Sequence, residues 1–442
     1  MEYLIIAAQL ITSLALLVVL HEFGHFIPAK LFKTRVEKFY LFFDPGFALF
    51  KKKIGETEWG IGWLPLGGYV KIAGMVDESM DKEQLNQPAQ PWEFRSKPAW
   101  QRLIIMLGGV TVNFVLGLFI YAMILFTWGR SYSTPKTAEK FGMYVADPEL
   151  KKFGLEDGDI PVKVGSKSID NLAKMFTYIV IDGERDVTVK RDGQLVTVTL
   201  PQDFDQIALK NQWVQLYALR MPIVIAETGK ESGAQKAGLQ SGDSILAVNG
   251  TTTSYFDEFQ TVVRANKGKA IELDFVRNGE AKTVTALVDT NGMVGIAPYG
   301  PARYNLNYEI EEFGFFESFP AGINYGIDVI KNYAKSLGLV FTKEGAKSVG
   351  GFGSMSKIFA PQWDWFTFWN ATALLSLILA FMNILPIPAL DGGHVVFLLY
   401  EIISGRKPSQ KVLEVAQYIG FFLLIGLMVY ANGNDLFKFL TK

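Results

Sequence analysis

A long apolar segment near the start of the chain, residues 3–31, contains the pentapeptide HEFGH at residues 21–25. Ionisable side chains are costly inside a lipid bilayer, so a group of them within a membrane-length segment indicates a function. His21 and His25 are four residues apart, which places both imidazoles on one face of a helix. The pattern therefore predicts a metal site that is held within a membrane.

The HExxH pattern supplies two metal ligands and a base. Neutral imidazole is a good zinc ligand, and Glu22 can reach a metal-bound water without being a ligand itself. Zinc lowers the pKa of that water towards ~7, so Glu22 can accept its proton and pass it to the nitrogen of a cleaved amide. The alternative is a polar patch that faces the interior of a helix bundle. This alternative is disfavoured because the three ionisable side chains of the motif would need partners that lipid cannot supply.

A catalytic zinc needs a third protein ligand and an open position. The chain has no cysteine and only three histidines, so the candidates are few. Asp391 and His394 both follow the third apolar segment, and we prefer Asp391 as the ligand, with His394 packing nearby or orienting a ligand. Pro386 and Pro388 predict a break in the helix before Asp391, whose freed amides and carbonyls could hold an extended peptide. A simple proline kink is the alternative.

Four segments are long and apolar enough to span a membrane, near residues 3–31, 103–128, 366–385 and 415–430, and the third is expected to continue or restart as a helix through 395–403. The first has no basic start and no obvious cleavage site, so we interpret it as a retained span. Basic residues follow the first and third spans, which places those loops in the cytoplasm and both termini outside. The helix from His21 to Lys30 is about 13 Å long, so the metal should lie within the bilayer, nearer its cytoplasmic face.

Between the second and third spans, residues 129–365 alternate short β-type runs with turn signals and contain a repeat. The sequence GLEDGDI at residues 154–160 recurs as GLQSGDSI at residues 238–245, an offset of 84 residues (238 minus 154). A second repeated motif occurs at residues 189–193 and again at residues 275–279. We therefore expect two copies of one small module that is mostly β or α/β.

Residues 313–360 follow the repeats and carry apolar side chains at near-helical spacing, interrupted by Lys331, Lys335 and Glu344. This pattern predicts an amphipathic helix that lies on the membrane, and a helix packed against the neighbouring module is the alternative.

The composition agrees with a chain that has both membrane-embedded and water-exposed parts, since 49% of its residues are hydrophobic and 20% are charged. The net charge of −1 offers no electrostatic case for nucleic-acid binding. The absence of cysteine excludes disulfides and thiolate zinc sites.

The HEFGH sequence, together with NILPIPALDGG at residues 383–393, resembles the motif pair of the site-2 protease family of intramembrane zinc metalloproteases. The repeat makes the chain similar to the RseP type of this family in bacteria. The resemblance covers nearly the whole chain. It implies His21, His25 and Asp391 as the ligands of one Zn²⁺ and Glu22 as the catalytic base.

The resemblance also implies substrate-binding positions on two segments. Asn383 and the neighbouring loop, with Pro386 and Pro388, are expected to hold the substrate backbone. Residues 65–71 match the family's membrane-reentrant β-loop, which is thought to bind substrate as an added strand, and the positions implied there are Gly67, Gly68 and Tyr69. An exposed strand edge can accept an extended peptide in this way. An ordinary cytoplasmic hairpin is the alternative.

The two repeats resemble tandem PDZ domains through the pattern GLxxGDxIxxVNG, which is best preserved at residues 238–250. The first copy is degenerate, which puts binding of a carboxylate terminus by that copy in doubt. In this family the pair is thought to act as a size filter that excludes substrates with large external domains. The second span departs from the family's Gly-Pro-x-x-Asn, because residues 109–113 read GVTVN and lack the proline.

The expected fold is a polytopic α-helical membrane protein with four transmembrane helices, a membrane-associated β-hairpin and two extracytoplasmic PDZ-like domains. Its expected parts are the first transmembrane helix with HExxH (1–33), a cytoplasmic or membrane-reentrant β region (34–102), the second transmembrane helix (103–128), the two PDZ-like domains (129–215 and 216–300), an amphipathic region (301–365), the third transmembrane helix and its NxxPxPxLDGG loop (366–404), and the fourth transmembrane helix with the C-terminus (405–442).

The expected function is regulated intramembrane proteolysis by a zinc metalloendopeptidase that cuts the transmembrane segments of pre-trimmed single-span proteins. The resemblance implies anti-sigma factors and remnant signal peptides as substrates and the bacterial inner membrane as the location. Both termini and the PDZ-like domains would be periplasmic, with the active site near the cytoplasmic side, and we expect a monomer with no nucleic-acid partner.

Two other functions remain as alternatives. The first is a non-catalytic, metal-binding membrane scaffold or receptor that uses its PDZ pair, against which Glu22 argues because a pure binding site needs no base. The second is a metal transporter, which a single intramembrane cluster and four spans disfavour.

Overall fold

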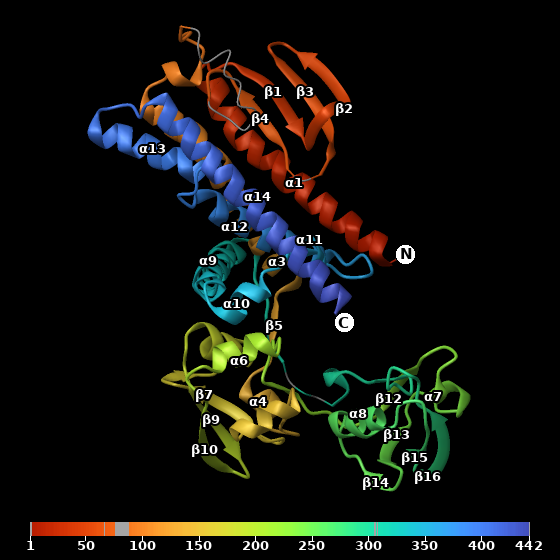
Figure 1. The fold of residues 1–442 in the computed structure, drawn as a ribbon. Coiled ribbons are helices and arrows are strands. Elements are labelled where there is room, and N and C mark those ends of the chain that lie inside the picture. Colours follow the sequence, from red (N-terminus) through yellow and green to blue (C-terminus); the bar gives the residue numbers. More distant parts are fainter. Residues whose placement is uncertain (1, 66, 76–87, 305, 307, 442) are drawn as a thin grey trace. The chain divides into compact units, whose positions relative to one another are not determined.

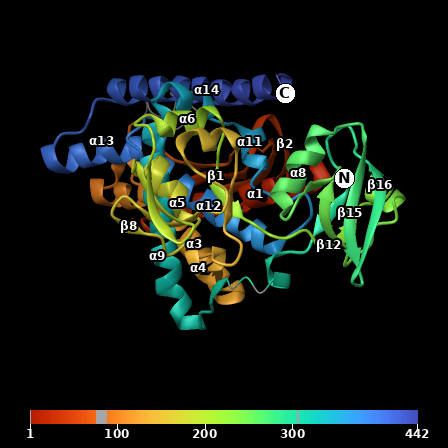
Figure 2. The same cartoon turned by 90° about the horizontal axis from the view of Figure 1, so that it is seen from below.

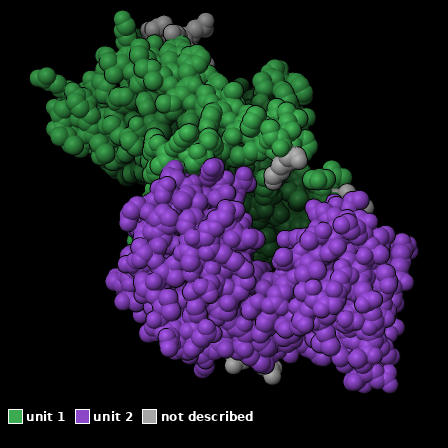
Figure 3. All heavy atoms as spheres, turned by 60° about the horizontal axis from the view of Figure 1, so that its bottom comes forward, with its two compact units in different colours: residues 1–129, 312–442 green, residues 130–311 purple. Residues whose placement is uncertain are grey.

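The computed structural model describes residues 2–65, 67–75, 88–304, 306 and 308–441. The chain divides into two compact units (Figure 3): unit 1 comprises residues 1–129 and 312–442, and unit 2 comprises residues 130–311. Unit 1 therefore contains the apolar segments and the HEFGH sequence, and unit 2 contains the sequence repeat.

Four helices of the described chain are long and apolar enough to cross a membrane, namely α1 (Glu2–Leu31), α3 (Ala99–Trp128), α12 (Trp365–Ile384) and α14 (Gln410–Leu440). These are the four spans that hydropathy predicts. Helix α12 ends before Pro386, and a separate helix, α13 (Asp391–Ser404), begins after the loop. The prolines thus break the helix as predicted, because a proline inside a helix lacks the backbone N–H that it needs.

Helix α3 packs against α1, α12, α13 and α9 and so forms the centre of unit 1. Its contact with α1 is made backbone to backbone, because Gly24 of α1 faces Gly108 and Gly109 of α3. A Cβ at Gly24 would lie 2.7 Å from the Gly109 Cα, well inside normal contact distance. Small residues let membrane helices approach closely, and here they bring the HEFGH turn directly against α3.

A four-stranded sheet follows α1 and lies beside it (Figure 1). Its strands are β1 (Val36–Leu41), β2 (Phe43–Ile54), β3 (Thr57–Leu64) and β4 (Tyr69–Ile72). Their order is β2-β3-β1-β4, with β1 and β3 parallel and the other neighbours antiparallel. The sequence predicts only a hairpin here. The sheet is larger because β1 and β4 pair with each other and add to the β2–β3 hairpin.

Helix α9 (Phe315–Val340) packs against α3 and α12 within unit 1, and its Gly322 lies against Ala122 of α3. It is the helix expected after the repeats, and part of its surface is covered by a membrane-length helix. Two short helices follow, α10 (Lys343–Ser348) and α11 (Phe352–Ser356). Helix α14 lies along the outside of the helices of unit 1 (Figure 2), and few of its residues are buried.

Unit 2 contains two repeats that share one strand order, β8-β7-β9-β10 in the first and β14-β13-β15-β16 in the second. The first repeat is built from β5 (Arg130–Tyr132), α4 (Pro135–Ala138), β6 (Met143–Val145), β7 (Ile160–Val164), β8 (Lys167–Ser168), α5 (Lys174–Phe176), β9 (Asp186–Arg191), β10 (Gln194–Thr199), α6 (Phe204–Lys210) and β11 (Tyr217–Leu219). The second is built from β12 (Ile225–Thr228), α7 (Gly233–Lys236), β13 (Ser244–Val248), β14 (Thr251–Thr252), α8 (Phe256–Ala265), β15 (Ala270–Arg277), β16 (Glu280–Leu287) and β17 (Ile296–Pro298). Strand β18 (Glu309–Glu311) returns to pair with β5.

Each repeat holds the same ion pair between its two recurring motifs. Arg191 Nε lies 2.7 Å from Asp159 in the first repeat, and Arg277 Nε lies 2.7 Å from Asp243 in the second. Each arginine also donates to the carbonyl of the glycine that opens the GLxxGD pattern. The two recurring sequence motifs therefore supply the two partners of one ion pair, which explains why they recur together.

Candidate metal centre

Three side chains from two helices converge on one point in unit 1. His21 and His25 come from α1, and Asp391 is the first residue of α13. Asp391 Oδ2 lies 3.2 Å from His21 Nε2 and 3.3 Å from His25 Nε2, and the two Nε2 atoms are 3.1 Å apart. Among the described residues, this is the His/Asp/Glu group that could hold a metal ion, and His394 is not part of it.

The donor set fits a divalent metal ion. Asp391 Oδ2 is buried and has no hydrogen-bond partner, although two imidazole nitrogens face it. Two ring nitrogens and a carboxylate oxygen that lie within 3.3 Å of one another are arranged as the ligand atoms of one shared cation would be. Two histidines and one carboxylate are a known ligand set for catalytic zinc, with a fourth position open.

A backbone carbonyl of α3 orients one of the histidines. His25 Nδ1 lies 2.8 Å from the Ile105 carbonyl oxygen, and the ring is buried. A carbonyl oxygen can only accept, so Nδ1 carries the proton and Nε2 keeps its lone pair for a metal. The close approach of α1 and α3 at Gly24 makes this contact possible.

Glu22 is buried beside the metal ligands, with 9% of its surface exposed. The backbone of Val70, in β4, lies close to its carboxylate. Strand β4 is the edge of the sheet, so the edge strand passes directly beside the carboxylate. A buried carboxylate beside this cluster could accept a proton without binding the ion itself.

The loop between α12 and α13 positions Asp391. Cβ atoms at Gly392 and Gly393 would collide with carbonyl and backbone atoms of residues 384–388, so only glycine lets the loop fold back on the start of α13. Ala389 adopts a φ of 74° within the same loop. From α14, Gly420 packs against the Pro388 carbonyl. The two glycines of the DGG sequence are therefore needed for the shape of the loop that positions Asp391.

The predicted substrate-binding residues of this loop lie close to Asp391 in sequence and differ in exposure. Asn383 is in the last turn of α12 and is half-buried, as is Pro388, whereas Pro386 is exposed. The structure places all three on the segment that leads into the first residue of α13. Their contact with substrate remains a prediction.

The predicted positions before β4 have structural roles as well. Leu66 lies outside the described residues. A Cβ at Gly68 would meet the Tyr40 carbonyl oxygen at 2.6 Å and Val18 of α1 at 2.7 Å, so glycine allows this turn to approach α1. Gly67 has a φ of 152°, and Tyr69 stacks on Tyr40 and donates its hydroxyl to Asp44. Contact of these residues with substrate also remains a prediction.

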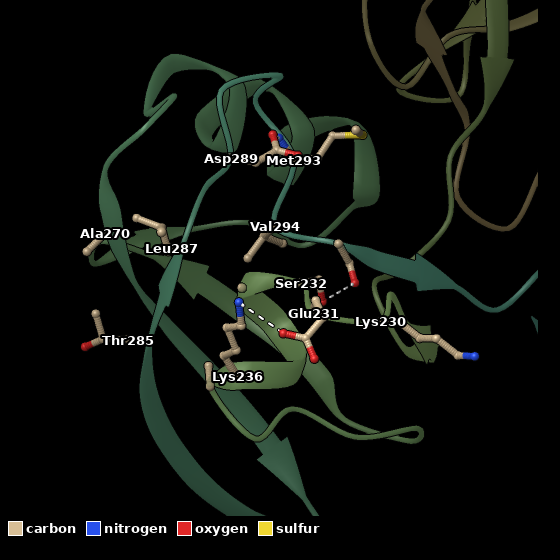
Figure 4. Close-up of a pocket in the computed structure, with 13 residues that line it drawn as sticks. Lys230, Glu231, Ser232, Lys236, Ala270, Thr285, Leu287, Asp289, Met293 and Val294 are labelled. Atoms are coloured by element: carbon tan, nitrogen blue, oxygen red, sulfur yellow. Dashed lines mark hydrogen bonds and ion pairs between the residues drawn. The ribbon is translucent and has the colours of Figure 1, made fainter.

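A surface pocket of about 540 Å³ belongs to unit 2 and shares no residue with the metal cluster. It lies in the second repeat, and residues of α7, Leu287 and Val294 line it (Figure 4). Its charged groups include the ion-paired Lys236 and Glu231.

Comparison with known proteins identifies a peptidase family. The model of peptidase family M50 matches residues 9–427. The regulator of sigma-E protease RseP of Escherichia coli is 29% identical over 97% of each chain. The regulator of sigma E protease of Haemophilus influenzae is 26% identical over 99% of this chain and 100% of its own. A Neisseria meningitidis protein named as a candidate zinc metalloprotease is 27% identical over 97% of this chain and 98% of its own.

The family match covers both helices that supply the metal cluster, together with the sheet and the repeats. The chain belongs to peptidase family M50, the site-2 protease family of zinc metallopeptidases that its two motifs resemble.

Proposed function

We propose that the chain is a zinc-dependent endopeptidase that hydrolyses peptide bonds within the transmembrane segments of other proteins. One observation carries the proposal: the His21, His25 and Asp391 cluster adjoins buried Glu22 on a helix long and apolar enough to span a membrane. Relatives named as zinc metalloproteases support the choice of metal.

The residues divide the chemistry between them. His21, His25 and Asp391 would hold the zinc ion, which when bound would lower the pKa of a coordinated water and polarise the scissile carbonyl. The Glu22 carboxylate takes the proton that the attacking water loses and returns it to the departing amide nitrogen, so that one water is consumed per bond cleaved. The backbone of Val70 borders that carboxylate.

The substrate has to unwind before it is cut, because a helical peptide bond is shielded and its carbonyl is engaged in the helix. We infer that the unwound segment adds as a strand to the edge of β4, since β4 borders Glu22 and ends the sheet. The loop around Asn383, Pro386 and Pro388 would hold the other side of the same peptide. Such contacts would hold an extended backbone beside Glu22 and the metal cluster.

The substrates we propose are single-span membrane proteins already trimmed outside, such as anti-sigma factors and remnant signal peptides, in the inner membrane of a bacterium. Relatives named as regulators of sigma-E support this class. In this arrangement both termini and the two PDZ-like repeats are periplasmic, and the repeats exclude substrates with large external domains. The metal then lies nearer the cytoplasmic face.

The test is cleavage of a model single-span substrate by purified full-length protein in proteoliposomes, with metal content measured on the same samples. Glu22→Gln should retain zinc, and its cleavage rate should fall by at least about a hundredfold, the usual contribution of general acid–base catalysis. The control is Glu149→Gln, an exposed glutamate of unit 2, which should cleave at the wild-type rate. Full cleavage by Glu22→Gln would refute the mechanism, and wild-type protein without zinc would refute the site.

A further inference from the structure

The second ring nitrogen of His21 has a partner on α3 that the proposed chemistry does not use. Asn113 is almost fully buried, with 1% of its surface exposed, and its side-chain amide lies 3.3 Å from His21 Nδ1. In this orientation of the amide, Nδ2 lies towards the ring and Asn113 Oδ1 is a buried oxygen without a hydrogen-bond partner. A buried polar atom without a partner is costly and calls for an explanation.

The role of His21 as a ligand decides which way this amide must point. His21 Nε2 faces the cluster, so metal binding requires its lone pair there and places the ring proton on Nδ1. A protonated Nδ1 is a donor and needs an acceptor, whereas the Nδ2 group of an amide can only donate. The oxygen and nitrogen of an amide side chain are told apart by their hydrogen bonds rather than by shape.

We propose that Asn113 is a positioning residue for the metal site, whose Oδ1 accepts the Nδ1–H of His21 when the metal is bound. A half-turn of the amide places the orphaned oxygen against His21 Nδ1. The two histidines are then oriented in the same way from one helix: Ile105 of α3 accepts from His25, and Asn113 accepts from His21. The inference rests on the proposed metal site and extends it to α3.

The backbone of α3 holds Asn113 in place. Ser376 of α12 donates a 2.7 Å hydrogen bond to the Asn113 carbonyl, and both residues are buried. One turn earlier, Gly109 leaves the space that the rings occupy, since a Cβ there would lie 2.6 Å from His21 Cε1. Helix α3 is continuous from Ala99 to Trp128, and Gly109 and Asn113, one turn apart, both lie against the histidines.

The test is the zinc affinity of the full-length protein, measured by competition with a chelator, together with the visible spectrum of the Co²⁺-substituted protein. Asn113→Leu has a similar volume and no acceptor, and it should weaken zinc binding by roughly 10- to 100-fold, the usual effect of losing such a partner. Asn113→Asp offers an acceptor and no donor, so it should bind zinc within about threefold of wild type. The control is Asn266→Leu, the same substitution in unit 2, which removes the hydrogen bond to the Val262 carbonyl and should leave the affinity unchanged.

The outcomes separate this inference from the proposed function. Wild-type protein without zinc would refute the metal site itself. Tight zinc binding by wild type and equally tight binding by Asn113→Leu, with an unchanged Co²⁺ spectrum, would overturn the role of Asn113 alone. Loss of affinity in Asn113→Asp as large as in Asn113→Leu would show that the amide donates to His21, contrary to our assignment. Should Asn113→Leu fold poorly, the comparison of Asn113→Asp with wild type still decides between acceptor and donor.

Discussion

Adding one methyl group at Gly24 should disable the metal site without touching a ligand. A Cβ at this position would lie 2.6 Å from the Gly108 carbonyl carbon and 2.7 Å from the Gly109 Cα. Carbon atoms normally approach to about 3.5 Å, so the two helices must move apart by about 1 Å. Both obstacles are backbone atoms of a helix, so no side chain can turn away to relieve the clash.

The separation acts directly on His25, which depends on α3 for its orientation. A movement of about 1 Å would lengthen the 2.8 Å contact between His25 Nδ1 and the Ile105 carbonyl to about 3.8 Å, which is no longer a hydrogen bond. Overpacking of this kind costs about 1–3 kcal/mol, against which alanine regains ~1 kcal/mol of helix propensity. The net loss of global stability should therefore be no more than about 2 kcal/mol. Misplacement by about 1 Å can reduce catalysis about a hundredfold.

Zinc affinity, cleavage of a model transmembrane substrate and thermal unfolding would be measured on Gly24→Ala. The expected result is a loss of zinc binding and of cleavage by a factor of ten or more, with a transition temperature close to wild type. Gly426→Ala is the matched control, because Gly426 lies in α14 and a Cβ there meets nothing within 4 Å. Gly24→Ala with wild-type zinc affinity and rate would refute the account of the α1–α3 contact.

Two further predictions concern ion pairs at a distance from the metal. Arg102 and Glu401 are nearly buried, and their ion pair joins α3 to α13. Glu401→Gln leaves the arginine charge without its partner and should destabilise the protein by about 3–5 kcal/mol. The double variant Arg102→Met with Glu401→Met removes both charges and should recover much of that loss in thermal unfolding. In unit 2, burial opposes the ionisation of Asp243, but hydrogen bonds from Arg277 and the Gln240 amide outweigh it and hold the pKa of Asp243 below its ordinary value. A lowered folded-state pKa stabilises the fold above the unfolded pKa of about 3.9, and this contribution is lost as the pH falls further. Asp243→Asn should therefore lower the stability of unit 2 at neutral pH and weaken its dependence on pH below about 4. Amide exchange resolved by segment would test this, and identical acid profiles for both proteins would contradict it.

Much of the architecture follows from local pattern. The lengths and apolar content of four segments predict α1, α3, α12 and α14, because transfer into lipid depends on the composition of each segment alone. Pro386 and Pro388 predict the end of α12 for a similarly local reason. The GLxxGD repeat predicts two like modules, since each copy repeats the same turn and strand signals.

Other features depend on contacts between distant parts of the chain. The sequence of the β region predicts a hairpin. The parallel pairing of β1 with β3 and the addition of β4 depend instead on contacts between strands that are not adjacent in sequence. The sequence also leaves two candidates, Asp391 and His394, for the third metal ligand. Only the fold of the α12–α13 loop brings Asp391, and not His394, into the cluster among the described residues.

The sequence by itself determined which residues can carry the chemistry: two histidines at helical spacing, a glutamate beside them and a carboxylate after a broken helix, all in or next to apolar segments. The tertiary structure decided how they are held. Gly24 against Gly108, Val70 against Glu22 and Asn113 against His21 are contacts between separate elements, and no local pattern encodes them. The physical reason is that side-chain type depends on one residue's own chemistry, whereas ligand orientation depends on the distance and rotation between two packed helices.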